Sequence, residues 1–405
     1  VFLVADWGGN ALVYGALAST YSAFQLIGAP ILGRWSDSIG RRKVLLLSQF
    51  GTTVSWIVFL IAFLLPADPV FSVDNVLLGQ FSLTLPLIVL FFARAADGLT
   101  GGNVSVANAY LADISDDQHR TENFGRMAMS TNAGFILGPA LAGLLGATMF
   151  GEVLPVMAAL VISIVASLLI LFGLRESRTT LIETKPGLKN ACKVFGQETK
   201  ESYRLEGCDV TPTQQILRLP RMPALLTVNF LVMLGFSFFY IAFPTHAALG
   251  LDWTVTDTGV YFAVLSLFMV AVQGPLLAWL SRRLSETVLV SGGGLILAAG
   301  FVLLLWPAKP VLYCAAALIA LGNGLMWPTF TAVLSKQAGE TFQGAVQGFA
   351  SSIGAAASIV GLIGGGLLYT WIGSWVFVLS AAIIGVAALL SIDSGRHQMA
   401  APEPA

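Results

Sequence analysis

Long apolar stretches alternate with short polar segments from one end of the chain to the other. Each stretch holds about the 20 apolar residues that a helix needs to cross the roughly 30 Å hydrocarbon core of a bilayer. The pattern therefore predicts an all-α membrane protein with eleven spans. The predicted spans are residues 11–33, 44–65, 83–112, 124–146, 154–174, 224–245, 257–280, 287–306, 310–334, 344–367 and 372–392.

Basic residues gather in the polar segments on one side of the predicted membrane spans. All but two of the 21 Lys and Arg residues fall within or directly beside alternate inter-helix segments or in the tail. The exceptions are Lys309, in the opposite set of segments, and Arg94, inside a span. Since cytoplasmic loops retain an excess of Lys and Arg, we expect residues 1–10 outside and the tail after Ser391 in the cytoplasm. This orientation fits a multi-pass protein of the bacterial inner membrane.

The composition and motifs of the chain argue against several classes of function. Only 11% of the residues are charged, against about 25% in soluble domains, and a net charge of −1 offers no surface for nucleic acid. The sequence contains no CxxC, HExxH or Ser/His/Asp pattern and no phosphate-binding GxxxxGK[ST] loop. We therefore expect neither an enzyme nor a protein with a metal or cofactor, and any energy coupling has to come from an ion gradient.

A polar segment divides the chain. Residues 175–223 contain nine basic residues and are too long for an ordinary connection between helices, so we interpret them as a cytoplasmic linker. This gives an N-terminal helix bundle at 1–174, a C-terminal bundle at 224–392 and a cytoplasmic tail at 393–405. Five predicted spans precede the linker and six follow it. A further helix before Val1 would complete two sets of six, and the alternative is a genuine eleven-helix protein.

The two halves repeat short sequences at equivalent positions. Gly28–Asp37 (GAPILGRWSD) is echoed by Gln273–Arg282 (QGPLLAWLSR), and Ala96–Leu99 (ADGL) by Gly322–Leu325 (GNGL). Two related helical halves around a site near the bilayer midplane are typical of secondary transporters. The alternative is chance similarity between apolar helices that contain Gly and Pro.

The loop after the first predicted span has a specific pattern. It reads Gly33-Arg-Trp-Ser-Asp37-Ser-Ile-Gly40-Arg41-Arg42-Lys43 and resembles the signature loop of the major facilitator superfamily. We expect Gly33 to let helices approach closely and Gly40 to permit a tight turn, while a plain positive-inside anchor would explain only the basic run. The resemblance implies the major facilitator fold, with two pseudo-symmetric six-helix bundles. It also implies a cytoplasmic latch formed by Gly33, Asp37, Gly40, Arg41 and Arg42.

A charged pair lies inside the predicted span 83–112. Arg94 is about eleven residues into that span, close to mid-bilayer at a rise of about 1.5 Å per residue. An uncompensated charge there costs at least about 2.5–3.5 kcal/mol, and Asp97, three residues later on the same helical face, can neutralise it. The segment from Arg94 to Gly98 resembles the fourth-helix motif of the superfamily. That resemblance implies that Arg94 and Asp97 take part in proton coupling, and the alternative is a static structural pair.

A glycine-rich stretch in the predicted span 124–146 resembles the fifth-helix motif of antiporters in the same superfamily. Small residues at every fourth position favour close helix contact, and Pro139 can kink the helix because it has no backbone donor. The resemblance implies antiport, whereas generic helix packing would explain the glycines alone. The motif residues are Gly134, Gly138, Pro139 and Gly143.

Two further segments strengthen the resemblance. Ala109–Asp116 (AYLADISD) and Gly173–Ser177 (GLRES) look like segments of the tetracycline-type drug:proton antiporters. The likeness extends over most of the chain but is sharp only within residues 28–177.

The sequence also predicts a cavity between the two halves, with aromatic walls and few polar groups, which suits amphipathic solutes. We expect a monomeric, proton-coupled antiporter that exports amphipathic or drug-like small molecules by alternating access, with substrate, protons and membrane lipid as its partners. The alternatives are a proton-coupled symporter for a small organic solute and a transport-dead sensor or scaffold of the same fold. The candidate cavity residues are Gln25, Asn103, Asn229, Tyr240, Gln273, Asn323, Trp327 and Phe330.

Overall fold

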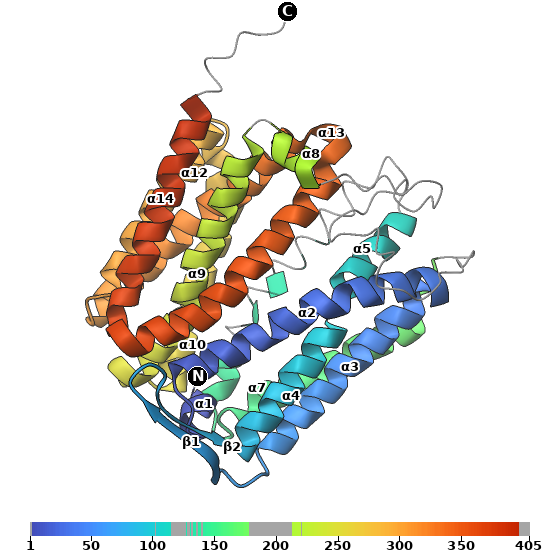
Figure 1. Cartoon of the computed structure of the whole chain (residues 1–405), viewed down its shortest axis with the longest axis vertical. Helices are drawn as coiled ribbons and strands as arrows, with labels where there is room; N and C mark the ends of the chain where they lie inside the picture. The colour runs from blue at the N-terminus through green and yellow to red at the C-terminus, as the bar shows by residue number, and fades with distance from the viewer. Residues whose placement is uncertain are drawn as a thin grey trace, which may run out of the picture.

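Helices make up nearly all of the regular structure in the computed structural model (Figure 1). The structure describes residues 2–101, 103–114, 127, 130, 133–134, 137–138, 141–177, 213–219 and 221–396. The helices before the linker are α1 (Phe2–Asp6), α2 (Ala11–Ile39), α3 (Arg41–Ala62), α4 (Leu85–Thr100), α5 (Asn103–Ile114) and α7 (Val153–Gly173). Those that follow are α8 (Thr213–Arg218), α9 (Met222–Gly250), α10 (Val255–Ala271), α11 (Leu277–Leu280), α12 (Glu286–Leu303), α13 (Lys309–Ile372) and α14 (Val376–Arg396).

Many of these helices have the length and composition of membrane spans. Among the described residues, seven helical segments are long and apolar enough to cross a bilayer, and the most apolar is Val153–Gly173. Helix α4 has 16 residues and falls short of that length, while the predicted span 124–146 lies mostly outside the described residues. The apolar outer faces of these helices suit lipid better than water, so the molecule has a multi-pass architecture.

The helices gather into two groups (Figure 1). The first contains α2, α3, α4, α5 and α7, and the second contains α9, α10, α12, α13 and α14. Helix α2 packs along α13, where the two groups meet.

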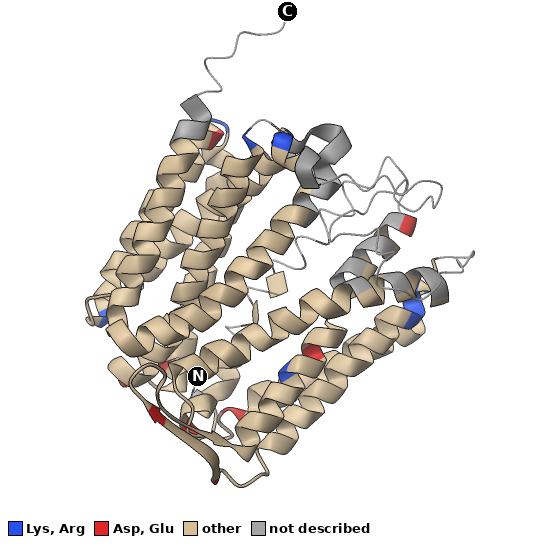
Figure 2. Cartoon of the chain, viewed as in Figure 1, with Lys and Arg blue, Asp and Glu red and all other residues tan. Residues whose placement is uncertain are grey.

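Charge distinguishes the two ends of the molecule (Figure 2). Helices α3, α9 and α12 begin at the end opposite the β-hairpin, where Figure 2 shows blue segments, and we call this the basic end. Arg41 begins α3, and Arg221 and Arg283 precede α9 and α12 along the chain. The opposite end, which we call the hairpin end, carries Lys309 at the start of α13 and the β-hairpin described below. For the basic residues that the structure describes, the sorting along the sequence is thus also a sorting in space. The side of the membrane that each end faces stays a prediction.

Aromatic rings fill the core of the second group. Phe239 stacks on Phe301 with ring centroids 5.0 Å apart, and Phe243 stacks on Tyr261 at 4.3 Å. All four are at most 1% exposed. Because aromatic side chains bury large apolar areas, this cluster contributes strongly to the packing of α9, α10 and α12.

Three helical predictions need correction. The span predicted at 83–112 is two helices, α4 and α5, which separate at Gly101. The spans predicted at 310–334 and 344–367 are two limbs of one helix, α13, whose helical bonding continues through the connection. Both ends of α13 lie at the hairpin end, since Lys309 pairs with Asp257 and Trp371 contacts the hairpin, so the helix folds back at the basic end.

The third correction concerns α10. The span predicted at 257–280 contains a wide turn, η3 (Val272–Leu276), with π-helical bonding between α10 and α11. Pro275 lies inside this turn. Because proline cannot donate a backbone hydrogen bond, it interrupts regular α-helical bonding at this point.

An antiparallel β-hairpin lies between α3 and α4, where the apolar pattern predicts only a connection. Its strands are β1 (Pro69–Asn75) and β2 (Gly79–Thr84). The turn at residues 76–78 ends at Gly79, whose positive φ of 73° is readily adopted by glycine. Val76 in the turn is 96% exposed. The hairpin lies outside the helical spans and does not alter the helical class of the fold.

Candidate functional site

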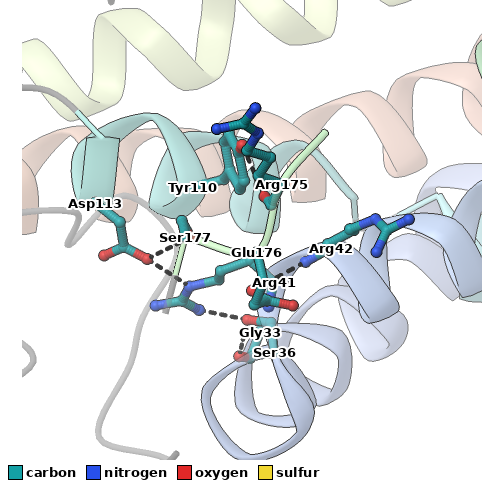
Figure 3. Close-up of polar contacts among 9 residues, drawn as sticks. All are labelled: Gly33, Ser36, Arg41, Arg42, Tyr110, Asp113, Arg175, Glu176 and Ser177. Atoms are coloured by element: carbon teal, nitrogen blue, oxygen red, sulfur yellow. Dashed lines mark hydrogen bonds and ion pairs between the residues drawn. The ribbon is translucent and has the colours of Figure 1, made fainter. Parts of the chain in front are cut away.

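The signature loop lies in a polar cluster at the basic end (Figure 3). The Arg41 side chain is 1% exposed, and its Nε donates to Oδ2 of Asp113 in α5 at 3.2 Å. Nη1 of Arg41 donates to the Ser36 hydroxyl. The hydroxyl of Ser177, at the end of the GLRES segment, donates to the same Asp113 oxygen at 3.2 Å. Three segments that the sequence analysis identified separately therefore meet around one buried guanidinium.

Glu176 caps the start of α3 in the same cluster (Figure 3). Its Oε1 accepts the backbone N–H of Arg41 at 2.7 Å and that of Arg42 at 3.4 Å. A carboxylate at this position satisfies N–H groups that have no partner within the helix and complements the positive end of the helix dipole. Gly40 has a φ of 107°, and a Cβ there would overlap the Glu176 carboxylate. The backbone conformation therefore favours glycine, and a Cβ there would displace the capping carboxylate of Glu176.

The other latch residues have different surroundings. Nη2 of Arg42 donates to the Leu171 carbonyl at 2.5 Å, which ties α3 to the end of α7. No described atom lies within 4 Å of a Cβ built on Gly33. The described part of the structure thus shows no close contact at Gly33, and the expectation that it lets helices approach stays a prediction. The side chain of Asp37 lies outside the described part of the structure.

The second polar site lies inside the first group of helices. Nη1 of Arg94 is 3.2 Å from Oδ2 of Asp97, so the two residues form the ion pair that their spacing allows. Asp97 is 8% exposed, and the hydroxyl of Thr52 in α3 lies beside its carboxylate. The Arg94 guanidinium also lies over the ring of Tyr21 in α2, 4.9 Å from the ring centroid. Arg94 thus has an anionic and an aromatic neighbour.

Glycines of α4 allow α2 to come close to this pair. A Cβ on Gly98 would overlap the Tyr21 carbonyl and approach Phe24 Cβ to 2.9 Å. Nε2 of Gln25 donates to the Gly101 carbonyl at 2.9 Å and to the Tyr21 hydroxyl at 3.3 Å. Gln25, a predicted cavity residue, therefore belongs to the surroundings of the ion pair.

Sequence reasoning missed Tyr21 and Thr52 as neighbours of the ion pair. The spacing of Tyr21 and Gln25, four residues apart on one face of α2, was the available signal. Nothing in the sequence near Thr52 indicates which helix it faces.

The antiporter motif is only partly described. Gly143 packs against Gly259 of α10, and a Cβ on either glycine would overlap the backbone of the other. Gly134 and Gly138 are exposed, with no described atom within 4 Å of a built Cβ. Pro139 lies outside the described residues. In the described part of this motif, Gly143 is the glycine in close contact with another helix.

Several predicted cavity residues are engaged in packing. Asn229 is 3% exposed, and its Nδ2 donates to the Ala350 carbonyl at 2.8 Å, which ties α9 to α13. Phe330 is 2% exposed and stacks on Trp327 with ring centroids 5.9 Å apart. In this conformation Asn229 and Phe330 form part of the packed interior.

The remaining predicted cavity residues are more accessible. Nδ2 of Asn323 lies 3.8 Å from the sulfur of Met269, and the residue is half-buried. Tyr240 is 49% exposed, Gln273 is half-buried within η3, and Asn103 is half-buried at the start of α5. Within the described ranges, no three His, Cys, Asp or Glu side chains come together in a way that could hold a metal ion.

Relatives with sequence similarity include drug resistance proteins. The tetracycline resistance protein, class E, of Escherichia coli is 28% identical over 401 residues, covering 96% of this chain and 88% of that protein. The class G protein of Vibrio anguillarum is 29% identical over 384 residues, covering 91% and 85%. The multidrug resistance protein 2 of Bacillus subtilis (strain 168) is 26% identical over 361 residues, covering 88% and 79%.

Solved transporter structures share the fold. The human organic anion transporter MFSD10 (TETRAN) matches with a TM-score of 0.62 and 22% identity, covering 93% of this chain and 83% of that one. A D-xylose-proton symporter matches with a TM-score of 0.69 and 13% identity, covering 94% and 87%. The predicted all-α transporter fold is thereby confirmed.

The family assignment follows from the length of the match. The model of the Major Facilitator Superfamily covers residues 1–362 of this 405-residue chain. Together with the apolar helices, this makes the chain an integral, multi-pass membrane protein. The protein belongs to the Major Facilitator Superfamily and is a transporter related to tetracycline and multidrug resistance proteins.

Proposed function

We propose that the protein is a proton-coupled antiporter that exports amphipathic or drug-like small molecules by alternating access. The observation that carries the proposal is the Arg94–Asp97 ion pair, 3.2 Å apart within the apolar helix α4 inside the first group of helices. Ionisable residues inside a membrane are costly and commonly form proton relays. The likeness to tetracycline resistance proteins supports the direction of transport.

The ion pair offers a direct way to link a proton to a change of shape. When Asp97 binds a proton, its carboxylate becomes neutral and its attraction to Arg94 largely disappears. Arg94 keeps its contact with the Tyr21 ring, so the cation does not have to leave the protein interior. Protonation of Asp97 would thereby weaken the ion pair within α4, while α4 keeps its contact with α2. The relative free energies of two arrangements of the helices would change as a result.

Aromatic surfaces with few charges favour an amphipathic substrate. Tyr240 is 49% exposed and Trp327 is half-buried, and a Cβ on Gly324 would lie 3.5 Å from Cγ of Gln273. Such walls bind flat or lipophilic molecules by stacking and apolar contact, and offer too few hydrogen-bonding groups for a sugar. We propose a monomer without a resident cofactor or catalytic activity. We place it in the bacterial inner membrane with its C-terminus in the cytoplasm.

The test measures proton movement in proteoliposomes that contain the purified full chain and an internal pH-sensitive dye. A panel of tetracycline, lipophilic cations and organic anions is added, and antiport requires protons to move opposite to the substrate. Asp97→Asn is expected to abolish the substrate-dependent proton signal, because an amide cannot carry the proton. Asp68→Asn is the matched control, since Asp68 lies in an exposed connection. Proton movement in the same direction as the substrate would support the symporter alternative, and an unchanged signal in Asp97→Asn would refute the coupling role.

A further inference from the structure

The turn of the hairpin contacts both groups of helices. The strand pairing ends at Asn75 and Gly79, so Val76, Leu77 and Leu78 form the turn. The Leu77 N–H donates to Oδ1 of Asn75 at 2.8 Å, which is a common way for Asn to stabilise a turn. Because the turn residues lie beyond the paired strands, their carbonyl oxygens can accept hydrogen bonds from other segments.

Adjacent carbonyl groups in this turn accept hydrogen bonds from opposite halves of the chain. The Leu78 carbonyl accepts from Nδ2 of Asn10 at 2.9 Å, and Asn10 caps the start of α2 by accepting the Val13 N–H at 3.1 Å. The Leu77 carbonyl accepts from Nε1 of Trp371 at 2.7 Å, near the end of α13. The turn therefore connects the beginning of α2 with the end of α13.

The base of the hairpin is attached to the first half of the chain. The Ser82 N–H donates to the Gly8 carbonyl at 2.7 Å, and the Thr84 hydroxyl donates to the Trp7 carbonyl at 2.9 Å. Thr84 is also the residue from which α4 begins. The hairpin is thus anchored to the first half of the chain by these hydrogen bonds, and Trp371 links its turn to the second half.

The two groups are in close contact at this same end. A Cβ on Gly15 would overlap the Leu362 carbonyl, and a Cβ on Gly366 would overlap the Ala11 carbonyl, so α2 and α13 meet backbone to backbone. Alternating access requires two such halves to separate at one end and then at the other. Opening the hairpin end therefore has to break the hydrogen bond of Trp371 as well as the glycine contacts.

We propose that residues 76–79 form a clasp that holds the hairpin end closed and has to release Trp371 before that end can open. The inference goes beyond the proposed proton coupling and does not depend on which ion or substrate drives transport. It rests on two neighbouring carbonyl groups that bind donors from different halves. The clasp stabilises one of the two arrangements that a transporter visits, and so sets how often the other one is reached.

The first experiment removes the donor of the clasp. Trp371→Phe keeps an aromatic ring but loses the N–H group, and Trp375→Phe is the matched control at the same end, where Trp375 is 63% exposed. Ala11→Cys, placed where α2 contacts Gly366, reports opening through its labelling rate with a bulky polar maleimide. In this reporter background Cys192, Cys208 and Cys314 are replaced by Ser.

Trp371→Phe is expected to label about fivefold faster than the parent, because a net hydrogen bond is worth about 1 kcal/mol and about 1.4 kcal/mol corresponds to tenfold. Trp375→Phe is expected to label at the parent rate. Equal labelling of Trp371→Phe and the parent would overturn the proposal.

The second experiment closes the clasp covalently. A Cβ on Gly79 would lie 3.9 Å from Cβ of Thr370, within the range of about 3.5–4.5 Å found in disulfides. Gly79→Cys with Thr370→Cys is oxidised in the same Ser-substituted background, and backbone amide exchange of residues 9–15 is followed by mass spectrometry. Exchange should slow when the disulfide forms and recover with dithiothreitol, while Thr370→Cys alone should not respond. A complete disulfide with unchanged exchange would show that the hairpin does not restrain this end.

Discussion

Gly143 and Gly259 pack so closely that a Cβ on either residue would overlap the Cα of the other. Gly143 belongs to the antiporter motif and Gly259 to α10, so the contact joins the two halves of the chain. Small residues allow helix backbones to approach in this way. A glycine pair at such a contact permits two helices to pivot with little steric obstruction.

Gly143→Ala is therefore expected to impair transport. An added methyl group in a packed contact costs about 1–3 kcal/mol and separates the helices. Gly138→Ala is the matched control from the same motif, because no described atom lies within 4 Å of its built Cβ. Export by cells expressing each variant at equal membrane levels measures the effect. If both variants lose activity equally, the motif acts through something other than the Gly143 contact.

Tyr21 is expected to position Arg94 through the face of its ring. Tyr21→Phe keeps the ring and should retain most activity, although it loses the hydroxyl that Gln25 contacts at 3.3 Å. Tyr21→Leu removes a cation–π contact worth about 0.5–2 kcal/mol, so proton-driven transport should fall about two- to thirtyfold. The pH dependence of transport separates positioning from folding, since loss of the Arg94 contact should shift the profile. A purely structural role would lower activity equally at every pH.

Glu176→Gln is expected to lower stability by about 1 kcal/mol, because a helix cap and its charge contribute about this much. Glu176 accepts the first N–H groups of α3, and an amide oxygen is a weaker acceptor. Arg175→Gln is the control, since the Arg175 side chain is exposed and its recorded contact with Tyr110 uses the backbone carbonyl. Thermal unfolding in detergent measures the difference. A lower melting temperature for Arg175→Gln than for Glu176→Gln would contradict the capping role.

The exposed ion pair at the hairpin end should contribute little to the stability of the folded protein. Lys309 and Asp257 are 3.2 Å apart with side chains 64% and 36% exposed, and surface pairs are worth about 0–1 kcal/mol. Thr254 makes a reciprocal cap with Asp257 at the start of α10, a feature worth about 0.5–2 kcal/mol. Thr254→Ala is therefore expected to destabilise the protein more than Lys309→Ala. Chemical unfolding of both variants gives the order, and the reverse order would refute this assignment.

The sequence could predict helical spans because their apolar character is set by the membrane. It also identified Arg94 and Asp97, since two charges three residues apart within an apolar stretch have few partners except each other. Tyr21 could not be paired with Arg94 in the same way. That contact depends on how α2 crosses α4, which Gly98 permits but does not specify.

The hairpin and the wide turn in α10 are indicated by local sequence features other than the long apolar stretches. Apolar and polar residues alternate over Phe71–Asp74 and over Gln80–Thr84, with Gly79 at the turn, a pattern typical of β-structure. Pro275 marked the position of the wide turn in α10. The continuous helical bonding through the fold-back of α13 has no comparable signal, because Gly339 and Gly344 favour a break there.

The wide turn η3 also gives α10 a property that a regular helix lacks. A π-helical turn holds one more residue than an α-helical turn, and this excess can migrate along a helix while most backbone hydrogen bonds persist. A shift by one position rotates the residue that it passes by roughly 100° about the axis. Gln273 sits within η3, so a shift of this kind would turn its amide toward a different neighbour while α10 stays folded.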